Sequence, residues 1–407
     1  MKFNKWTVGL AAVGVVSLAS AARADEQMSM VNTALSQTTL SGFVDTAMQW
    51  NPGSDSGPGY LGYPGNVAHY SFAQDDGFSL NAVDVALDKP EDSSQWAAGY
   101  HIEAMVGADA VGIGGFGGAP GTGTATLRQA FIRLHTPVGG NGIDWQIGVW
   151  DSIIGYESNS DPLNPNYTRS YGYTIEPTTF TGILGTYKVN DEISLSAGIA
   201  NDEYANLTVP GNTFESEKAY MGSVSLTAPA SMGFLNGATL SGGVIHNTDS
   251  KAGFGSTTSV YAGTTVPTPV TMLKVGASFD YLWETATFAT APGVVNGGGI
   301  YDIAAYATIQ ATPKLSFNGR AEYVNDSSAP GDAVVLYSFA TPTGAEGNAA
   351  EELTATVQYN LWANVMTRGE FRWDHVEHGS PLGDSTSTGA PFRSNDFLLA
   401  LNVIYQF

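Results

Sequence analysis

The amino-acid sequence predicts an all-β protein, a transmembrane antiparallel β-barrel of about 16 strands, with 14 or 18 strands as the alternatives. Three observations lead to this fold class. Polar and apolar residues alternate along many long segments, aromatic residues stand at the ends of the apolar stripes, and short turns alternate with long connections. Aromatic residues make up 11% of the 407 residues, which argues against a disordered chain.

Alternation is the strongest of these signals. From Leu315 to Tyr323 every second residue is apolar or small, and the residues between them are polar or charged. The segment from Leu273 to Trp283 follows the same pattern. Such segments run for roughly 9 to 11 residues, which suits a tilted strand that crosses a bilayer, whereas strands of soluble proteins have about 5 or 6. The apolar stripe would then face lipid and the polar stripe the barrel interior.

Aromatic residues mark the ends of the apolar stripes. They are Trp50, Tyr187, Tyr281, Trp283, Tyr323, Tyr359, Trp373 and Tyr405. Membrane barrels carry girdles of aromatic side chains at both interfaces. A soluble all-β sandwich is the alternative explanation of the alternation, because its strands also have one apolar face. The length of the segments and the placement of the aromatic residues favour the membrane barrel.

The connections fall into two classes. Short turns are predicted near 89–94, 137–142, 190–192, 228–236, 267–270, 311–314 and 360–362. Long loops are predicted near 51–76, 107–124, 154–173, 202–216, 247–257, 285–299, 325–350 and 377–394. Together they separate about 16 strands, the arrangement of an even barrel with short periplasmic turns and long outer loops. The strand near 258–266 has the weakest pattern.

The N-terminus has the features of an export signal. Lys2 and Lys5 precede a short apolar run, and a small-x-small cleavage pattern ends at Ala24. An anchoring helix is the alternative, but the run is short for a membrane span. We therefore expect a signal peptide in 1–24, a short periplasmic lead-in in 25–37, and an outer-membrane barrel in 38–407.

Charge and composition narrow the range of partners. The formal net charge of −22 argues against a nucleic-acid partner. The chain has no cysteine, so no disulfide can hold it together. Its six histidines are scattered without the spacing of metal ligands, and we expect no metal and no cofactor. A barrel enzyme would need a placed nucleophile and base. The sequence shows no such motif, and we expect no enzymatic activity.

The chain ends on the regular alternation FLLALNVIYQF, whose last residue is Phe407. Leu398 and Ile404 are apolar exceptions on the otherwise polar face of this segment. A closed barrel requires the segment to pair with the first strand, Leu40 to Trp50, so that no sheet edge faces lipid. A terminal aromatic residue on such a strand resembles the signal that the outer-membrane assembly machinery reads. We therefore expect this machinery to be a partner through Phe407.

Several stretches resemble the beta-barrel porin-2 (OmpL-like) family of bacterial outer-membrane proteins. LSGFVDTAMQWN, from Leu40, resembles the first strand of that family, and FSLNAVDVALDKP, from Phe78, resembles the second. The segment 127–158 resembles a hairpin that leads into a loop, and 164–187 resembles the return from it. The match in the returning segment is carried by Arg169, Glu176, Pro177 and Gly182. The resemblance is specific over about residues 40–200, and it implies an outer-membrane pore without a particular solute.

Charged residues on the polar stripes are the candidates for lining such a pore. An Arg or Lys on the lipid face would cost about 2–4 kcal/mol at mid-membrane, so these side chains should face the interior. The candidates are Asp45, Glu103, Arg133, Lys274, Asp280, Arg320, Glu322, Arg368, Glu370, Arg372 and Asp374. Charged rings set ion preference in pores, and the acidic excess predicts a mild preference for cations.

The long connection from about Ile154 to Thr174 is a candidate constriction loop. The loop at this place in general porins folds inward and narrows the pore. Its candidate residues here are Glu157, Asp161, Arg169 and Glu176. An ordinary outer loop is the alternative.

These features predict a porin of the bacterial outer membrane, surrounded by its lipid. It would form a water-filled channel for passive diffusion of ions and small hydrophilic solutes. A homotrimer would be the usual assembly. A substrate-selective sugar or nutrient channel is the main alternative, and a plugged structural barrel and a barrel enzyme are further ones. Phe43 and Trp150 are aromatic residues on polar stripes that a sugar channel could use.

Overall fold

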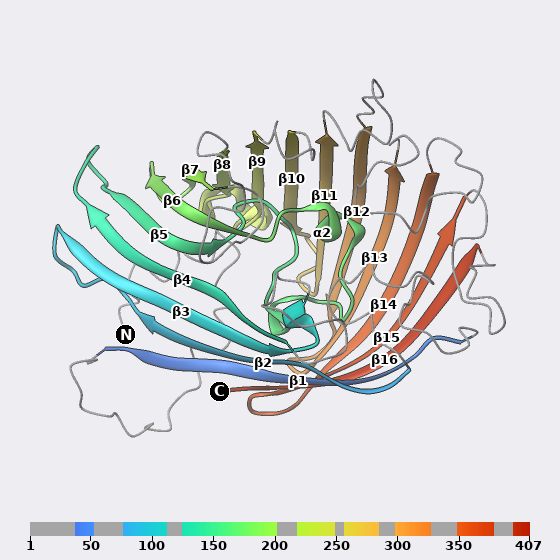
Figure 1. Cartoon of the computed structure of the whole chain (residues 1–407). Coiled ribbons are helices and arrows are strands. Elements are labelled where there is room, and N and C mark those ends of the chain that lie inside the picture. Colours follow the sequence, from blue (N-terminus) through green and yellow to red (C-terminus); the bar gives the residue numbers. More distant parts are fainter. Residues whose placement is uncertain are drawn as a thin grey trace.

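The computed structural model describes residues 37–52, 76–111, 124–201, 218–248, 256–284, 298–326, 348–377 and 394–407. In these residues sixteen antiparallel strands form a closed barrel in sequence order, with the first strand paired to the last (Figure 1). The predicted fold class and the strand number of 16 are therefore confirmed. The predicted signal peptide, with its cleavage site at Ala24, and nearly all of the predicted lead-in lie outside the described residues.

The strands are β1 (Thr39–Trp50), β2 (Gly77–Lys89), β3 (Ala97–Gly107), β4 (Thr124–Thr136), β5 (Ile143–Asp151), β6 (Thr179–Lys188), β7 (Ile193–Ala200), β8 (Ala219–Thr227), β9 (Thr239–Asn247), β10 (Thr257–Pro267), β11 (Leu273–Glu284), β12 (Gly298–Gln310), β13 (Leu315–Asp326), β14 (Asn348–Trp362), β15 (Val365–Val376) and β16 (Asn395–Gln406). Short helical turns are η1 (Asp109–Val111), η2 (Asp161–Leu163), α2 (Tyr171–Ile175) and η3 (Ala230–Leu235). None of the helices in the described part of the chain is long and apolar enough to cross a membrane.

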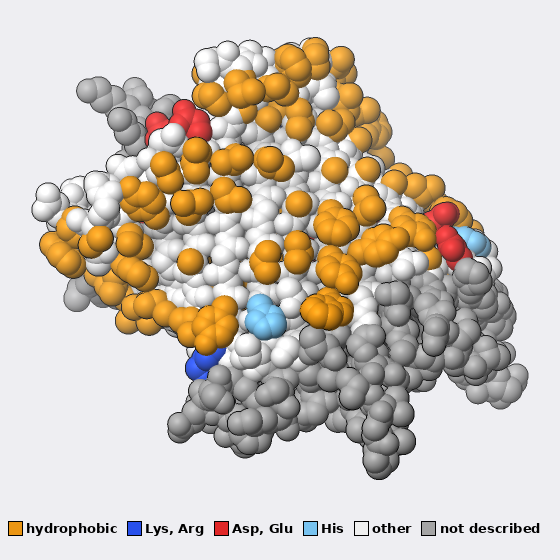
Figure 2. All heavy atoms as spheres, turned by 90° about the horizontal axis from the view of Figure 1, so that it is seen from above, with side chains coloured by type: hydrophobic (Ala, Val, Ile, Leu, Met, Phe, Trp, Pro, Cys, Tyr) orange, Lys and Arg blue, Asp and Glu red, His pale blue; other side chains and the backbone are white. Residues whose placement is uncertain are grey.

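Burial alternates along the strands as the sequence pattern predicts. In β16 the residues Leu399, Leu401 and Val403 are exposed on the outer face, while Leu398 and Ile404 are fully buried on the inner face. Figure 2 shows one face of the molecule, on which hydrophobic side chains are numerous and charged side chains are few. An outer surface of this kind suits contact with lipid tails, and it leaves the polar stripes inside the barrel.

The barrel closes where Gly42 meets Phe407. The backbone nitrogen of each residue donates to the carbonyl oxygen of the other at 3.0 Å. A Cβ added at Gly42 would lie 2.8 Å from Cζ of Phe407 and 2.1 Å from the carbonyl oxygen of Asp84. Only glycine fits there, and the terminal aromatic ring lies against it.

One predicted turn lies two residues further along the chain. The sequence pattern predicts a turn over 360–362, but β14 continues to Trp362, which pairs with Val365. The turn itself consists of Ala363 and Asn364, and Asn364 has a φ of 65°. Asparagine tolerates this left-handed conformation better than most residues. The register shifts at an irregularity in the pairing between Asn360 and Trp362. A prediction from strict alternation therefore places the turn too early in the chain.

The barrel has a short-turn end, defined by the connections 90–96, 137–142, 189–192, 228–238, 268–272, 311–314 and 363–364. The connection 152–178 between β5 and β6, called loop 3 below, contains η2 and α2 and crosses the barrel interior (Figure 1). Tyr167, Arg169 and Tyr171 of loop 3 are each at most 1% exposed. Apolar residues on the inner faces of the strands pack against the loop, including Trp150 and Ile404.

Candidate functional site

Loop 3 holds its own shape through local hydrogen bonds. Ser170 caps α2, because its hydroxyl accepts from the backbone nitrogen of Tyr173 at 2.9 Å. The side chain of Asn164 accepts from the backbone nitrogen of Ser158 at 2.8 Å and donates to the carbonyl oxygens of Ser158 and Ser160. The loop is therefore an ordered structure that can dock on the wall as a unit.

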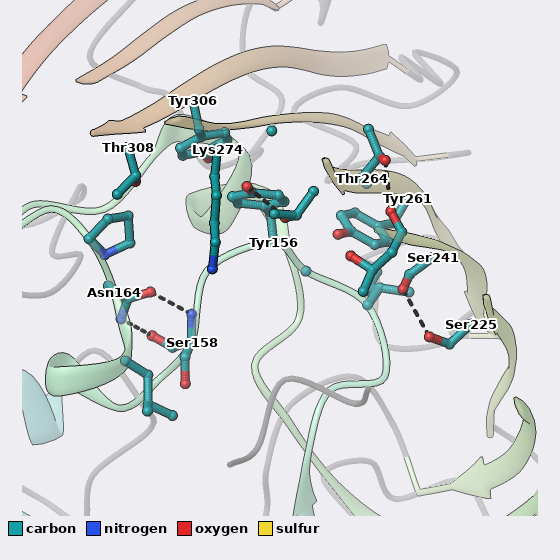
Figure 3. Close-up of a pocket in the computed structure, with 18 of the residues that line it drawn as sticks. Tyr156, Ser158, Asn164, Ser225, Ser241, Tyr261, Thr264, Lys274, Tyr306 and Thr308 are labelled. Atoms are coloured by element: carbon teal, nitrogen blue, oxygen red, sulfur yellow. Dashed lines mark hydrogen bonds between the residues drawn. The ribbon is translucent and has the colours of Figure 1, made fainter. Parts of the chain in front are cut away.

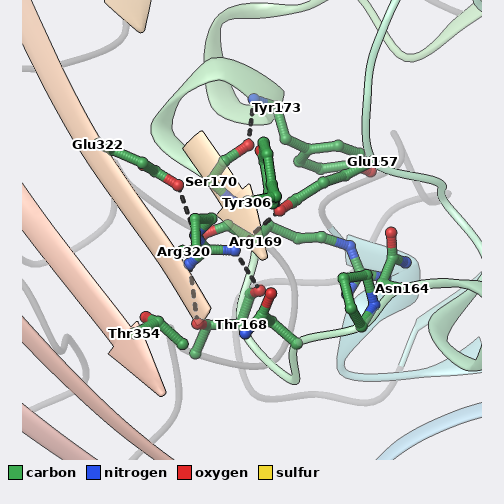
Figure 4. A network of polar contacts seen from close by, with 12 residues as sticks. Glu157, Asn164, Thr168, Arg169, Ser170, Tyr173, Tyr306, Arg320, Glu322 and Thr354 are labelled. Atoms are coloured by element: carbon green, nitrogen blue, oxygen red, sulfur yellow. Dashed lines mark hydrogen bonds and ion pairs between the residues drawn. The ribbon is translucent and has the colours of Figure 1, made fainter. Parts of the chain in front are cut away.

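Arg320 on β13 is the central contact between wall and loop (Figure 4). Its Nη1 lies 2.8 Å from Oε1 of Glu157 and donates to the carbonyl oxygen of Thr168, also at 2.8 Å. Its Nη2 donates to the carbonyl oxygen of Arg169 at 3.0 Å. On the wall side its Nε pairs with Glu322 at 2.5 Å and with Glu352 at 3.2 Å. The guanidinium thus satisfies several of its donors on loop 3 and the wall.

Two arginines on β15 bind loop 3 in the same manner. Nη1 of Arg368 donates to the carbonyl oxygens of Asn164 at 3.0 Å and of Asn166 at 2.7 Å. Nη1 of Arg372 donates to the carbonyl oxygen of Arg169 at 2.7 Å, and its Nη2 pairs with Asp374 at 2.9 Å. These arginines hold the loop by its backbone.

Wall carboxylates bind the donors of loop 3. Glu370 accepts from the backbone nitrogens of Tyr167 at 2.5 Å and Thr168 at 2.9 Å. Glu322 accepts from the backbone nitrogen of Tyr171 at 2.7 Å, and Asp374 accepts from its phenolic hydroxyl. The charged groups of β13 and β15 therefore fasten loop 3.

The helical turn α2 rests on two aspartates of the wall. A Cβ added at Gly172 would lie 2.7 Å from Oδ2 of Asp280 and 2.9 Å from Oδ2 of Asp302. The next carboxyl along loop 3, Glu176, shares a hydrogen bond with Asp280. Burial, together with the charge of Asp280, raises the pKa of Glu176 well above its usual value. The close approach therefore favours glycine at position 172 of α2. Separately, the burial of Glu176 and the charge of Asp280 favour its protonated form.

The sequence-predicted residues all face the barrel interior, but most of them are covered. Among the eleven candidates only Arg133 and Lys274 are not buried. Asp45 accepts from Nδ2 of Asn402 at 3.0 Å and lies near Arg368. In the proposed constriction loop, Arg169 pairs with Asp161 at 2.7 Å within loop 3. The interpretation of these side chains as freely solvated does not fit this burial.

A second charged cluster lies on β2–β5, and its central residue is missing from the sequence prediction. Arg128 lies 2.6 Å from Glu103 and 3.0 Å from Asp151. The pairing of β3 with β4 skips Arg128, so Arg128 and Gln129 are consecutive and both buried. This bulge breaks the strict alternation. Towards the short-turn end Arg133 pairs with Asp88 at 2.6 Å.

Glu91, His135 and Asp144 come closest to a metal-binding arrangement in the described residues. One ligand atom from each lies within 4.8 Å of the other two. The sequence pattern does not predict this grouping, because the three residues come from a turn and two strands. Nδ1 of His135 is 2.6 Å from Asp144, and the ammonium of Lys188 lies 3.6 Å from the same carboxylate. This ammonium already supplies a positive charge, and we assign no metal to the group.

Beneath loop 3, at the short-turn end of β7–β14, lies a cavity of about 560 Å³ that we call the vestibule (Figure 3). Loop 3 lines it with Tyr156, Ser158 and Asn164 among others. Serine, threonine, asparagine and glutamine side chains of the strands supply most of the wall. Lys274, one of the sequence-predicted residues, extends into it. The aromatic candidates Phe43 and Trp150 do not line this space and instead lie in the apolar clusters.

Comparison with known proteins identifies the family to which this barrel belongs. The profile of the family described as "Putative beta-barrel porin-2, OmpL-like" matches residues 37–407. The chain belongs to this family. As a member of the family it is an outer-membrane channel protein. No curated protein sequence matches the chain.

Solved structures of porins share the fold at low identity. An OmpT loop-deletion mutant, an outer membrane protein of Vibrio cholerae, is 12% identical with a TM-score of 0.56, over 91% of this chain and 99% of that chain. The outer membrane channel DcaP of Acinetobacter baumannii is 13% identical with a TM-score of 0.56, over 91% and 97%. An anion-selective porin from Comamonas acidovorans is 11% identical with a TM-score of 0.56, over 91% and 99%. These likenesses concern the fold.

Proposed function

We propose that this porin is a passive diffusion channel for ions and small hydrophilic solutes, and that loop 3 narrows its lumen. The observation that carries the proposal is the attachment of loop 3 to the opposite wall by Arg320, Arg368 and Arg372. A loop held in this way stays inside the barrel. It leaves the vestibule open on the short-turn side of the loop. It also sets the width of the path by which a solute passes the loop.

The burial of the wall supports a narrow path at the height of loop 3. Apolar side chains of the strands pack on the loop from several directions, and wall carboxylates such as Glu370 lie under it. Buried groups of this kind are hydrogen-bonded to the loop rather than free to meet a solute. The candidate constriction residues Glu157, Asp161, Arg169 and Glu176 therefore act mainly by placing the loop.

Single-channel recording in a planar bilayer tests this proposal. Purified full-length protein should give discrete ohmic steps whose conductance rises with salt. Deleting residues 158–168 should raise the conductance, because that stretch contains the backbone that Arg320 and Arg368 hold. Folding of the variant is checked by its heat-modifiable mobility on a gel. A folded deletion variant with unchanged conductance would refute the constriction, and a silent wild-type barrel would refute the diffusion channel.

A mild preference for cations is part of the proposal. Among the buried inner-face residues of the described strands, carboxylates outnumber arginines, with only Arg128, Arg320, Arg368 and Arg372 on the positive side. Fixed negative charge around a narrow path favours cations. The reversal potential under a salt gradient measures this preference, and a clear anion preference would contradict it.

Export, assembly and oligomeric state complete the proposal. The signal peptide would be removed after Ala24, and Phe407 would be read by the outer-membrane assembly machinery. A homotrimer is supported by the solved trimer form of OmpT from Vibrio cholerae, which is 12% identical with a TM-score of 0.55. The proposed role is transport and includes no catalytic activity. Mass spectrometry of the mature N-terminus and crosslinking in outer membranes test export and assembly state.

A further inference from the structure

Most of the strand side chains that line the vestibule carry a hydroxyl or an amide group. Besides loop 3, its walls carry hydroxyl side chains such as Ser194, Ser223 and Thr308 and amide side chains such as Gln358. Ser223, Thr308 and Gln358 make no side-chain hydrogen bond to the part of the chain that the structure describes. A hydroxyl group can both donate and accept, and an amide does the same through two atoms. A solute that carries many hydroxyl groups of its own matches such a surface.

Loop 3 adds an aromatic surface to the vestibule. The ring of Tyr156 stacks on Tyr306 with ring centroids 4.1 Å apart, and its hydroxyl bonds to Thr265 at 3.0 Å. A Cβ added at Gly276 would lie 1.9 Å from this hydroxyl, so the strand has to carry glycine for the tyrosine to lie against it. Tyr156 is therefore a fixed platform at the roof of the cavity. The apolar face of a sugar ring can pack on such a platform.

Among the described residues that line the vestibule, Lys274 has the single charged side chain. It is exposed, extends into the cavity, and pairs with no carboxylate in the described residues (Figure 3). None of the described residues that line the vestibule is a carboxylate, so an incoming anion would meet this ammonium without a competing negative charge from them. A charge-assisted hydrogen bond from this ammonium to a carboxylate is roughly twice as strong as a neutral one.

We infer that the vestibule is a binding site for small polyhydroxylated solutes and that it holds sugar acids more tightly than neutral sugars of the same size. The inference rests on the proposed channel function and names the solute class of that channel. Hydroxyl and amide side chains of the wall bind the hydroxyl groups, Tyr156 packs on the ring, and Lys274 binds the carboxylate. A volume of about 560 Å³ lies within the range of sites that hold small molecules. The preference among small ions is a separate property, because the carboxylates surround loop 3 and not the vestibule.

Current block in planar bilayers tests the inference, with D-glucuronate and D-glucose as a pair of equal size. Glucuronate added on the short-turn side should block the KCl current at a concentration at least about tenfold lower than glucose, the smallest ratio that one charge-assisted bond supplies. Lys274→Met should bring the two blocking concentrations together. The matched control is Lys314→Met, which removes the same charge from the turn 311–314 outside the vestibule. This control should keep the difference.

Two further measurements separate the possible failures. Calorimetric titration of the folded protein in detergent reports glucuronate binding without any need for conduction. The current recorded without solute reports on the channel itself. If no such current is recorded, the proposed function is contradicted, and the calorimetric result then decides the inference. Thr308→Val should weaken both solutes alike. Equal affinity for glucuronate and glucose, or a difference that survives Lys274→Met, would overturn the inference.

Discussion

Nη1 of Arg320 lies 2.8 Å from Oε1 of Glu157, and this contact joins a strand of the barrel wall to a loop 163 residues away in the sequence. Both side chains are at most 1% exposed at this contact. The same guanidinium binds two carbonyl oxygens of loop 3. A buried charge is expensive unless its partners are in place, so wall and loop depend on each other.

Removing the charge of Arg320 should release loop 3. Arg320→Gln leaves Glu157 and Glu322 without their cation, and breaking a buried ion pair of this kind costs about 3–5 kcal/mol. We expect a higher and noisier single-channel conductance and a lower temperature for the heat-modifiable transition. Arg133→Gln is the control, because its pair with Asp88 is partly exposed and should matter little. Equal behaviour of the two variants would contradict the anchoring role of Arg320.

Raising the pH should loosen loop 3 through Glu176. The pKa of Glu176 in the folded protein is raised, so the folded state holds its proton above the usual carboxyl range. The docked loop is then favoured below that raised pKa and loses stability as the pH rises through it. Conductance should increase toward alkaline pH, and Glu176→Gln should remove this dependence. Glu192→Gln in the turn 189–192 should leave the pH profile as in the wild type.

Adding a methyl group at Gly172 should displace α2. The new Cβ would meet the carboxylates of Asp280 and Asp302 at 2.7 and 2.9 Å, closer than real contacts allow. Either the loop or these two buried carboxylates must then shift, although alanine is by itself the better helix former. We expect Gly172→Ala to change conductance, and Gly319→Ala to keep it, because the nearest atom at Gly319 is 3.9 Å away. Unchanged current in Gly172→Ala would show that α2 has room to adjust.

Shortening the chain by Phe407 should impair closure as well as assembly. Its removal deletes both backbone hydrogen bonds to Gly42, whereas Phe407→Ala keeps them and loses only the ring. If the ring is a signal for the assembly machinery, Phe407→Ala should be depleted from outer membranes yet fold from urea into detergent. Equal depletion in both settings would assign the effect to barrel stability alone. Heat-modifiable gel mobility measures folding in each case.

The sequence determined the barrel itself. Alternation along a strand is a local property of the chain, and it is enough to predict the sixteen strands, the pairing of β16 with β1, and the inward direction of residues such as Arg368 and Glu370. The strand number follows from the count of short turns and long loops, and closure in lipid then requires the last strand to pair with the first. Even the weakly patterned strand β10 is present.

Other features depend on breaks in local regularity. Arg128 faces inward because a bulge places two consecutive residues on the same side, which strict alternation excludes. Leu398 and Ile404 look like exceptions on a polar face, but they pack inside against the same interior as loop 3. Their apolar character is explained by the packing of loop 3 in the barrel interior at that height, which the alternation does not show.

The tertiary structure alone decided what the inward charges do. The sequence places Arg320, Arg368 and Arg372 on polar stripes, and a solvated pore lining is the simplest role for them. In the folded chain they bind carbonyl oxygens of loop 3 that lie more than 150 residues away. Lys274 came from the same pattern and yet stands open in the vestibule. A period of two residues fixes the face on which a side chain lies, whereas its partner across the barrel is set by the closure of the wall and the path of the loop.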